Sequence, residues 1–429
     1  MKRLQLLTIL FCLLCTNNLL YAQHRSFSFY LENAYNNSPL IQERKNQMQI
    51  SKDELERLKA QYTRSRLEMN GDYLFVPIIN CDNGKTSFSL DTPNATNYYG
   101  YDTGVTSGEL RAGLTWTKPL LGHASYRVAQ QKENINRDLY QNQIQMERHE
   151  LNRAVTEQYL LCQSDRLGLT MTDSIACLLQ KQKGILEKLV RLAIVKQSDL
   201  HLLDIELRNN AQTSSSFRQS YWNHLLDLNL LCGISDTTYV ELDPVNLKMV
   251  SPVSSSRFLE PYMLDSLSLK ADNQLFNLQY RPQLNLFVDG GLRTSQFKNS
   301  YQHFGVSAGI SFSWLISDGK QRKAKYRQMQ AMLNTNEIYR QRKQLEILQK
   351  QSACYKQLAE QDMQLTDIRK QLTDYDKLLY DYQKEMIAGQ RSVLDYFTVL
   401  KNYIQQKKEY DSLLINRELI INASNYWNW

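Results

Sequence analysis

Cysteine and histidine are the residue types of this chain best suited to metal binding or nucleophilic catalysis, and neither is spaced for that chemistry. The first 22 residues have the pattern of a removable leader, and without them five of the seven cysteines remain. These five are odd in number, far apart and without C-x-x-C spacing, so we predict that they are small buried hydrophobes rather than ligands. They are Cys81, Cys162, Cys177, Cys232 and Cys354.

Other catalytic signatures are also missing. The sequence has no H-E-x-x-H run, no G-x-S-x-G elbow and no Gly-rich phosphate loop. The formal net charge of +7 comes from 51 Lys+Arg against 44 Asp+Glu, and the two signs are interleaved rather than gathered on one stripe. The sequence therefore predicts no enzyme, no cofactor, no metal and no nucleic acid partner.

A charged pattern that occurs twice is the remaining candidate for chemistry. Asp199 follows Ala193 by six residues, and Asp395 follows Gly389 by six, with Arg391 two places beyond that glycine. An aspartate at the start of a helix can cap it by accepting a backbone N–H. An arginine of one segment can also pair with an aspartate of the other, and copies of Asp395 around a symmetry axis would repel one another and attract cations. The sequence leaves both interpretations, helix cap and charged gate, open.

Each of these two charged segments is predicted to follow a long helix. Neither Gly nor Pro lies between Gly319 and Gly389, and a helix of roughly 70 residues is about 100 Å long. Apolar residues recur there with the a/d spacing of a coiled coil. The two rows are Leu358, Leu365, Leu372, Leu379 and Met386, and Ile368, Tyr375 and Tyr382. The earlier half of the chain steps similarly through Ile175, Leu178, Ile185, Leu189 and Leu192, with the polar Gln182 inside the row.

Four segments alternate between apolar and polar residues, near 69–79, 108–118, 283–292 and 304–315. In the last of them, Phe304, Val306, Ala308, Ile310, Phe312 and Trp314 alternate with small residues. Period 2 over about 9–11 residues, with aromatics near the ends, is typical of transmembrane β-strands around a polar lumen. An amphipathic sheet on a soluble core is the alternative for any one strand. Since four strands cannot close a barrel and lipid does not tolerate an open edge, we predict three copies with about twelve strands.

The order of these elements occurs twice, which predicts a tandem duplication. The first repeat, 23–233, holds a helical stretch from about 27 to 68, two strands, a long helix from about 122 to 193 and a return helix after 199. After a linker, 234–257, the second repeat, 258–429, holds a short helix to about 279, two strands, a long helix from about 320 to 388 and a return helix after 395. We predict that 80–106 is a long loop joining the first pair of strands.

The first 22 residues predict export. A basic start, Met1-Lys2-Arg3, precedes an apolar run over 4–14 that is too short to span a bilayer as a helix. Ala22 is the small residue of a cleavage site, so we expect 1–22 to be a signal peptide and the mature chain to start at Gln23. Lipid attachment at Cys15 and an uncleaved anchor are the alternatives.

The combination of long helices and duplicated strands resembles the TolC family of outer-membrane efflux proteins over nearly the whole mature chain. Phe29-Tyr-Leu-Glu-Asn-Ala-Tyr followed by Asn37-Ser-Pro39-Leu-Ile is similar to the opening helix of that family with its Asn-x-Pro-type turn. Pro119-Leu-Leu-Gly and Leu315-Ile-Ser-Asp-Gly319 are similar to its strand-to-helix exits. Ala388-Gly-Gln-Arg-Ser-Val-Leu-Asp395 resembles its Gly-x₅-Asp helix tip, and Leu192-Ala-Ile-Val-Lys-Gln-Ser-Asp199 resembles it with Ala193 in the glycine place.

This resemblance implies a mainly α-helical homotrimer with a twelve-stranded transmembrane barrel in outer-membrane lipid and an α-helical periplasmic tunnel. It implies the exit duct of a tripartite efflux or type I secretion system, working with an inner-membrane pump and a periplasmic adaptor (membrane fusion protein). Asp199, Gly389, Arg391 and Asp395 are implied to lie at a gated periplasmic entrance. The alternative function is a periplasmic coiled-coil adaptor or structural scaffold. Two departures from the family are the short helix before the second strand pair and Ala193, since alanine disfavours positive φ.

Overall fold

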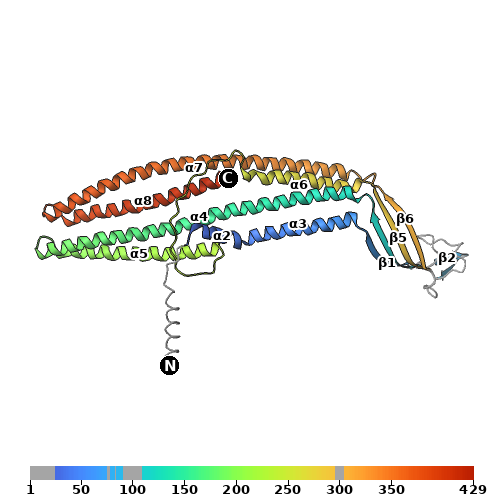
Figure 1. The fold of residues 1–429 in the computed structure, drawn as a ribbon, viewed down its shortest axis with the longest axis horizontal. Coiled ribbons are helices and arrows are strands. Elements are labelled where there is room, and N and C mark those ends of the chain that lie inside the picture. The colour runs from blue at the N-terminus through green and yellow to red at the C-terminus, as the bar shows by residue number, and fades with distance from the viewer. Residues whose placement is uncertain (1–24, 75–77, 83, 90–108, 295–303) are drawn as a thin grey trace, which may run out of the picture. The chain divides into compact units, whose positions relative to one another are not determined.

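The computed structural model describes residues 25–74, 78–82, 84–89, 109–294 and 304–429 (Figure 1). The predicted signal peptide and Cys15 lie outside these residues. The chain forms two compact units. The helical unit comprises Met1–Lys45, Gln141–Pro261 and Tyr339–Trp429, and the sheet unit comprises Asn46–Tyr140 and Tyr262–Ile338. Each unit contains segments of both predicted repeats, so the duplication remains a prediction from the sequence.

The first predicted helical stretch forms two helices, α2 (Phe27–Asn37) and α3 (Pro39–Thr63), which meet at the expected Asn-x-Pro turn. Ser38 separates them with an extended backbone, ψ 119°, because the ring of Pro39 disfavours a helical conformation in the residue before it. The Ser38 hydroxyl accepts the backbone N–H of Ile41 at 3.3 Å, and Pro39 occupies the first helical position, where its missing N–H costs nothing. The break is therefore encoded locally by the Ser-Pro pair.

The two long helices are α4 (Gly122–Arg191) and α7 (Gln321–Ile387). Each is followed by a return helix of 35 residues, α5 (Gln197–Leu231) after α4 and α8 (Val393–Trp427) after α7. The predicted seam of α7 is confirmed in its buried positions, which are Leu365, Ile368, Leu379 and Met386. The prediction for Leu192 is wrong: α4 ends one residue earlier, Leu192 is 68% exposed, and Leu186 and Leu189 are the last buried leucines of that helix.

The helix before the second strand pair is short, as predicted. It consists of α6 (Glu260–Phe276) between two 3₁₀ turns, η2 (Arg257–Leu259) and η3 (Asn277–Tyr280). The Ser256 hydroxyl accepts the backbone N–H of Phe258 and caps the first of these turns. No helix in the described part of the chain combines the length and hydropathy needed to cross a bilayer.

Four strands form one antiparallel sheet in the order β1-β4-β5-β6. Their bounds are Arg66–Leu74 for β1, Glu109–Pro119 for β4, Gln283–Thr294 for β5 and Phe304–Ser313 for β6. The first predicted strand, near 69–79, is wrong in its bounds, because β1 begins at Arg66 and ends at Leu74. A separate two-stranded sheet, β2 (Ile78–Asp82) with β3 (Lys85–Ser89), occupies the start of the predicted loop at 80–106. Gly84, which precedes β3, has φ 74°, in the left-handed region that glycine adopts readily.

The strand register gives the four-stranded sheet one apolar face. Residues directly opposite each other share a face, and the pairs Met69↔Leu114, Trp116↔Val288 and Leu286↔Ile310 continue it from strand to strand. Its large apolar members are Leu67, Met69, Tyr73, Leu110, Leu114, Trp116, Leu284, Leu286, Val288, Leu292, Phe304, Val306, Ile310 and Phe312. In the single chain this face is largely uncovered, since Met69 is 80% exposed, Val306 70% and Ile310 64%.

The opposite face of this sheet is polar. Asp289 on β5 accepts a hydrogen bond from the Thr115 hydroxyl of β4 at 2.7 Å and forms an ion pair with Arg111 at 3.4 Å. Asn70 of β1 continues the chain of contacts to Thr115 at 3.4 Å. The sheet thus largely separates apolar from hydrogen-bonding side chains, as the period of 2 predicts, with Phe287 on the polar face and Lys118 on the apolar face as exceptions.

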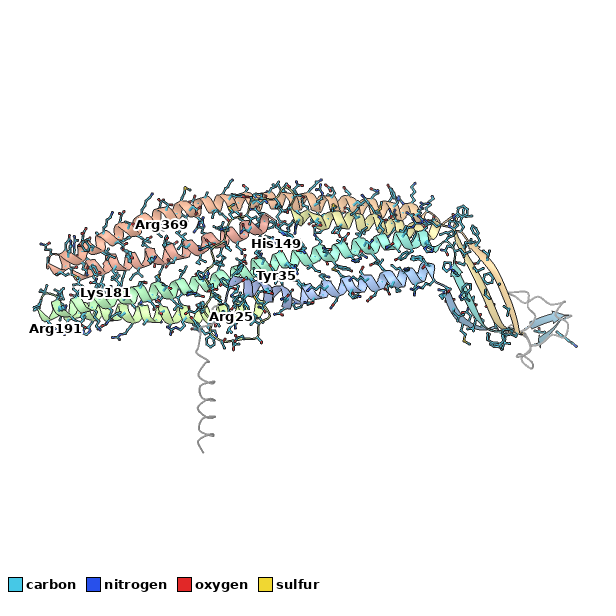
Figure 2. The ribbon with its side chains drawn as sticks, in the orientation of Figure 1. Arg25, Tyr35, His149, Lys181, Arg191 and Arg369 are labelled. Atoms are coloured by element: carbon cyan, nitrogen blue, oxygen red, sulfur yellow. The ribbon has the colours of Figure 1, made fainter. Side chains whose placement is uncertain are left out.

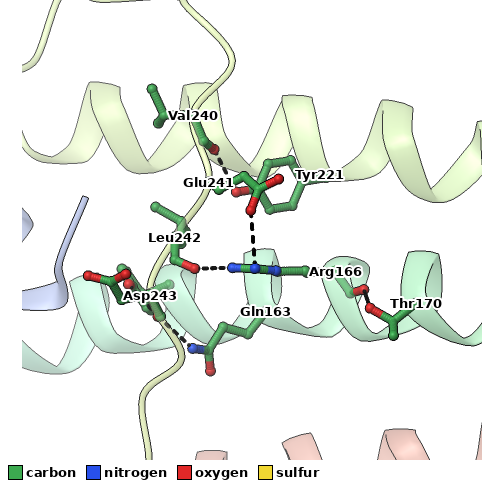
Figure 3. Close-up of polar contacts among 9 residues, drawn as sticks. Gln163, Arg166, Thr170, Tyr221, Val240, Glu241, Leu242 and Asp243 are labelled. Carbon is green, nitrogen blue, oxygen red and sulfur yellow. Dashed lines mark hydrogen bonds and ion pairs between the residues drawn. The ribbon is translucent and has the colours of Figure 1, made fainter. Parts of the chain in front are cut away.

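The predicted linker, 234–257, is bound along the helical unit through its backbone (Figure 3). The Tyr221 hydroxyl donates to the carbonyl of Val240 at 2.8 Å, and Gln163 donates to the carbonyl of Asp243 at 3.0 Å. Arg166 donates to the carbonyl of Leu242 and pairs with Glu241 at 3.2 Å. Side chains of α4 and α5 therefore satisfy the carbonyls of a segment that has no regular structure of its own.

An aromatic cluster fixes the last residues of α8 beside α4. His149, labelled in Figure 2, stacks on Tyr426 at 4.8 Å and on Trp429 at 4.2 Å between ring centroids. Its Nε2 lies 2.9 Å from the carbonyl oxygen of Tyr426. Burial in this cluster lowers the pKa of His149, so the ring favours its neutral form. Phe258 of η2 adds an edge-on contact at 5.7 Å.

Candidate functional site at the two helix tips

The first tip joins α4 to α5 and turns at Ala193. The backbone of Ala193 has φ 56°, in the left-handed region, and the N–H of Ile194 donates to the carbonyl of Leu189 at 2.9 Å. This is the hydrogen bond of a Schellman helix end. Figure 2 labels Arg191, the last residue of α4, at this tip.

The second tip joins α7 to α8 with the same backbone. Gly389 has φ 72°, and the N–H of Gln390 donates to the carbonyl of Glu385 at 2.9 Å. Alanine in the place of glycine at the first tip therefore leaves the shape of the turn unchanged. The two tips share one end of the helical unit (Figure 1), and one buried cluster contains Leu186 and Leu189 of the first hairpin with Met386 and Val393 of the second.

Exchanging the turn residues should change stability in opposite directions. We expect Ala193→Gly to stabilise the protein by about 0.5–1 kcal/mol, because alanine in the left-handed region costs about 1–2 kcal/mol and the greater unfolded-state freedom of glycine offsets part of that gain. Gly389→Ala should destabilise it by a similar amount. No atom lies within 4 Å of an added Cβ at Gly389, so φ alone sets that cost. Urea unfolding of both variants measures this, and shifts of the same sign would contradict it.

The two aspartates of the tips have different environments. Asp199 accepts the backbone N–H of Lys196 at 3.2 Å, which is the capping contact proposed from the sequence. At the second tip the cap is Ser392, whose hydroxyl accepts the backbone N–H of Asp395 at 3.1 Å. The Asp395 carboxylate is exposed and has no hydrogen-bond or ion-pair partner in the described part of the chain. A hydrogen bond of its side chain thus accounts for Asp199, whereas Asp395 places its charge in the first turn of α8, near Arg391, without such a bond.

Arg391 is held within its own hairpin. Its Nε donates to Glu385 at 2.9 Å, and its guanidinium lies 4.2 Å from the ring centroid of Tyr382. The hydrogen bond to Glu385 raises the pKa of Arg391, which stays charged. Within the described chain the arginine makes no contact with Asp199, so the latch between tips that the sequence suggested is not made inside one chain. Glu385 was not among the predicted residues; its place six residues before Arg391, across the turn, is the signal that identifies it.

Polar contacts also join the two hairpins behind the tips. Gln182, buried in the seam of α4, accepts a hydrogen bond from Gln383 of α7 at 3.4 Å. Lys401 of α8 pairs with Glu206 of α5 at 2.6 Å. Side chains of all four helices therefore fix the position of one tip against the other.

Tyr382 and Tyr380 provide a matched pair for testing the seam. Tyr382 packs against the buried tip cluster and under Arg391, whereas Tyr380 is 58% exposed and contacts Lys384. We expect Tyr382→Ala to destabilise the protein by about 1–3 kcal/mol and Tyr380→Ala by less than about 1 kcal/mol. Thermal unfolding of the purified protein ranks the two variants. The reverse order would show that the register of α7 is wrong.

The chain was compared with protein families, curated proteins and solved structures. No protein-family model matches the chain, and no curated protein matches it. Solved structures do match. One is CusC, whose structures were described in connection with transmembrane channel formation. It matches at TM-score 0.72 and 11% identity, over 94% of this chain and 91% of CusC. The outer membrane protein VceC of Vibrio cholerae matches at TM-score 0.70 and 10% identity over 94% and 95% of the two chains.

A third structure agrees with these two. The outer membrane channel CmeC of Campylobacter jejuni matches at TM-score 0.67 and 10% identity, over 94% of this chain and 85% of CmeC. The chain has the TolC-type fold. The resemblance stated from the sequence is thus confirmed at the level of fold, and the solved neighbours are named as channels or outer membrane proteins rather than enzymes.

The cysteines of this TolC-type chain are placed mostly as predicted. Cys162, Cys232 and Cys354 are buried, and burial raises the pKa of the Cys232 thiol to about 12 and that of Cys162 as well. Such thiols are poor nucleophiles at neutral pH. The prediction is wrong for Cys177, which is exposed, and the Cys81 side chain lies outside the described residues.

Proposed function

We propose that this protein is an outer-membrane channel, the exit duct of a tripartite efflux or type I secretion system. The observation that carries the proposal is the apolar face that continues across all four strands, with Lys118 near its edge, and is largely uncovered in the single chain. A soluble protein rarely exposes so large an apolar surface, whereas lipid covers it at no cost. The opposite, polar face then lines an aqueous lumen.

The assembly we propose is a homotrimer. β1 and β6 are the edges of the described four-stranded sheet, and lipid does not tolerate unpaired edge groups. Pairing β6 of one copy with β1 of the next removes both edges, and three copies supply about twelve strands. The two strands of the separate β2–β3 hairpin are not needed for this closure.

The tips are proposed as the periplasmic entrance, where an adaptor and an inner-membrane pump would dock. Two features support this: the tips end the long helical hairpins, and the exposed Asp395 carboxylate at the second tip has no hydrogen-bond or ion-pair partner in the described part of the chain. In this proposal Asp395 and Arg391 control passage, Gly389 shapes the turn, and Asp199 combines capping with charge. The predicted signal peptide, 1–22, would direct the chain across the inner membrane.

Fractionation followed by conductance tests the proposal. The protein should stay in the membrane pellet after carbonate extraction, dissolve in detergent and migrate as a trimer on SDS gels unless heated. In planar bilayers the trimer should open an ion-conducting pore. A carbonate-soluble monomer that does not conduct would support the alternative, a periplasmic adaptor or scaffold.

A further inference from the structure

A cavity of about 850 Å³ lies at the foot of the four-stranded sheet, entirely within the sheet unit. It is enclosed by the end of α3, the start of α4 and the end of α6 with η3. The first residues of β1 and β5 and the last residues of β4 complete it. Its volume is within the range of about 300–1,000 Å³ that small-molecule sites usually have.

The strand residues that line the cavity place it on the polar side of the sheet. Arg66 lies directly opposite Thr117, and Pro119 lies opposite Asn285, all on the face that carries Asp289 and Thr115. Of the strand residues in the lining, Leu284 alone belongs to the apolar face. In the proposed channel this cavity therefore opens toward the lumen rather than toward lipid.

The charge of the lining is one-sided. Four arginines line the cavity and none of the lining residues is acidic. Arg57 is neutralised by Glu54 at 2.6 Å and Arg66 by Glu68 at 3.0 Å. The two others, Arg64 and Arg281, have no hydrogen-bond or ion-pair partner for their guanidinium groups in the described part of the chain. Both arginines are exposed to solvent, and two guanidinium groups free of protein partners, each with a fork of five N–H donors, are suited to bind a carboxylate, sulfonate or phosphate.

The rest of the lining combines polar side chains with a group of apolar ones. Leu275 and Leu278 come from α6 and η3, and Leu121 precedes α4. Pro119 and Leu284 add apolar surface from the sheet. Such a surface beside two unpaired arginines complements a molecule that has both an anionic group and an apolar body.

We propose that this cavity is a lumenal binding site for amphiphilic organic anions, with Arg64 and Arg281 contacting the anionic group. The inference rests on the proposed channel function, because that function makes the polar face the lumen. It extends the function by naming a substrate class: the site would hold such anions briefly at the base of the barrel. An anionic phospholipid offers the same chemistry, so the test separates lipid from a molecule that arrives through water.

Two measurements on the full protein test the site, with deoxycholate below its micellar concentration as the probe. Titration calorimetry in a neutral detergent gives its dissociation constant, and current blocks in planar bilayers report its binding in the open pore. We expect Arg64→Gln and Arg281→Gln each to weaken deoxycholate binding by about tenfold in both measurements, and Arg64→Lys to weaken it less. Arg327→Gln is the matched control, because it removes the same charge from an exposed position of α7 outside the cavity. Dodecyltrimethylammonium, a cationic amphiphile, should bind equally to all variants.

The outcomes are distinct. Equal deoxycholate binding by the parent and both glutamine variants overturns the inference, whether or not the protein conducts. Arginine-dependent binding by a protein that forms no pore contradicts the proposed channel function and leaves the anion site in place. Anionic phospholipid that co-purifies with the parent and is lost from Arg64→Gln, seen by native mass spectrometry, would assign the cavity to lipid and overturn its role in the lumen.

Discussion

Ile310→Arg is expected to prevent most of the protein from assembling in the membrane, because it should destabilise the inserted state by about 2–4 kcal/mol. Ile310 lies opposite Leu286 on the apolar face and is 64% exposed in the single chain. In the proposed barrel it faces acyl chains, which cannot solvate a guanidinium group. Leu114→Arg, on the same face of β4 and 50% exposed, should act in the same way. The measurement is the fraction of membrane-extracted protein that migrates as a heat-sensitive trimer.

The matched control is Ser311→Arg, one residue from Ile310 on the opposite face of β6. Ser311 lies opposite Asn285, and a charge there would face water in the lumen, so trimer yield should stay near the parent value while conductance changes. Thr115→Arg shares that face but is a poorer control, because the Thr115 hydroxyl donates to Asp289 at 2.7 Å and the change removes that bond. Equal yields for Ile310→Arg and Ser311→Arg would disprove the membrane-strand assignment.

The sequence predicted the elements whose signal is periodic. A run without Gly or Pro and a seven-residue spacing identified α7, and Leu365, Ile368, Leu379 and Met386 are buried as that spacing requires. Alternation identified the two faces of β6 in the same way. Each of these signals repeats over many residues, so an error at one position does not change the result. Boundaries lack this redundancy, and the prediction for Leu192, next to the end of α4, was wrong for that reason.

Features that depend on contacts distant in sequence could not be predicted. Alternation does not say which strand lies beside which, so the continuity of the apolar face across β4 and β5 required the register. The backbone of 234–257 is held by Tyr221 and Arg166, whose hydrogen bonds leave no periodic mark in the sequence. The cavity with Arg64 and Arg281 is likewise assembled from distant segments. At the tips, spacing alone could not separate Asp199, which caps its helix, from Asp395, which does not.

In the proposed channel, opening of the pore should depend on the contacts that hold Arg391 to Glu385 and Tyr382. Arg391→Ser removes both the hydrogen bond to Glu385 and the stacking on Tyr382, so the turn of the second tip is less restrained and single-channel conductance should rise. Glu385→Gln separates the two contributions, because it weakens the hydrogen bond and keeps the arginine charge. If the hydrogen bond between Arg391 and Glu385 restrains the entrance, both variants should conduct more than the parent. If the arginine charge restrains it instead, only Arg391→Ser should conduct more than the parent.

Ion preference should depend on Asp395. In the proposed trimer three copies of this exposed carboxylate surround one axis, and their combined potential attracts cations and repels anions. Asp395→Ala should lower the preference for cations by about fivefold, which corresponds to a loss of about 1 kcal/mol of attraction, and should weaken block by multivalent cations. It should leave trimer yield unchanged, since Ser392 and not Asp395 supplies the cap.

Asp199→Asn is the control for charge at the other tip, because the amide oxygen can still accept the N–H of Lys196. Reversal potentials in a salt gradient give the preference, and an unchanged value for Asp395→Ala would place the selective ring elsewhere in the pore.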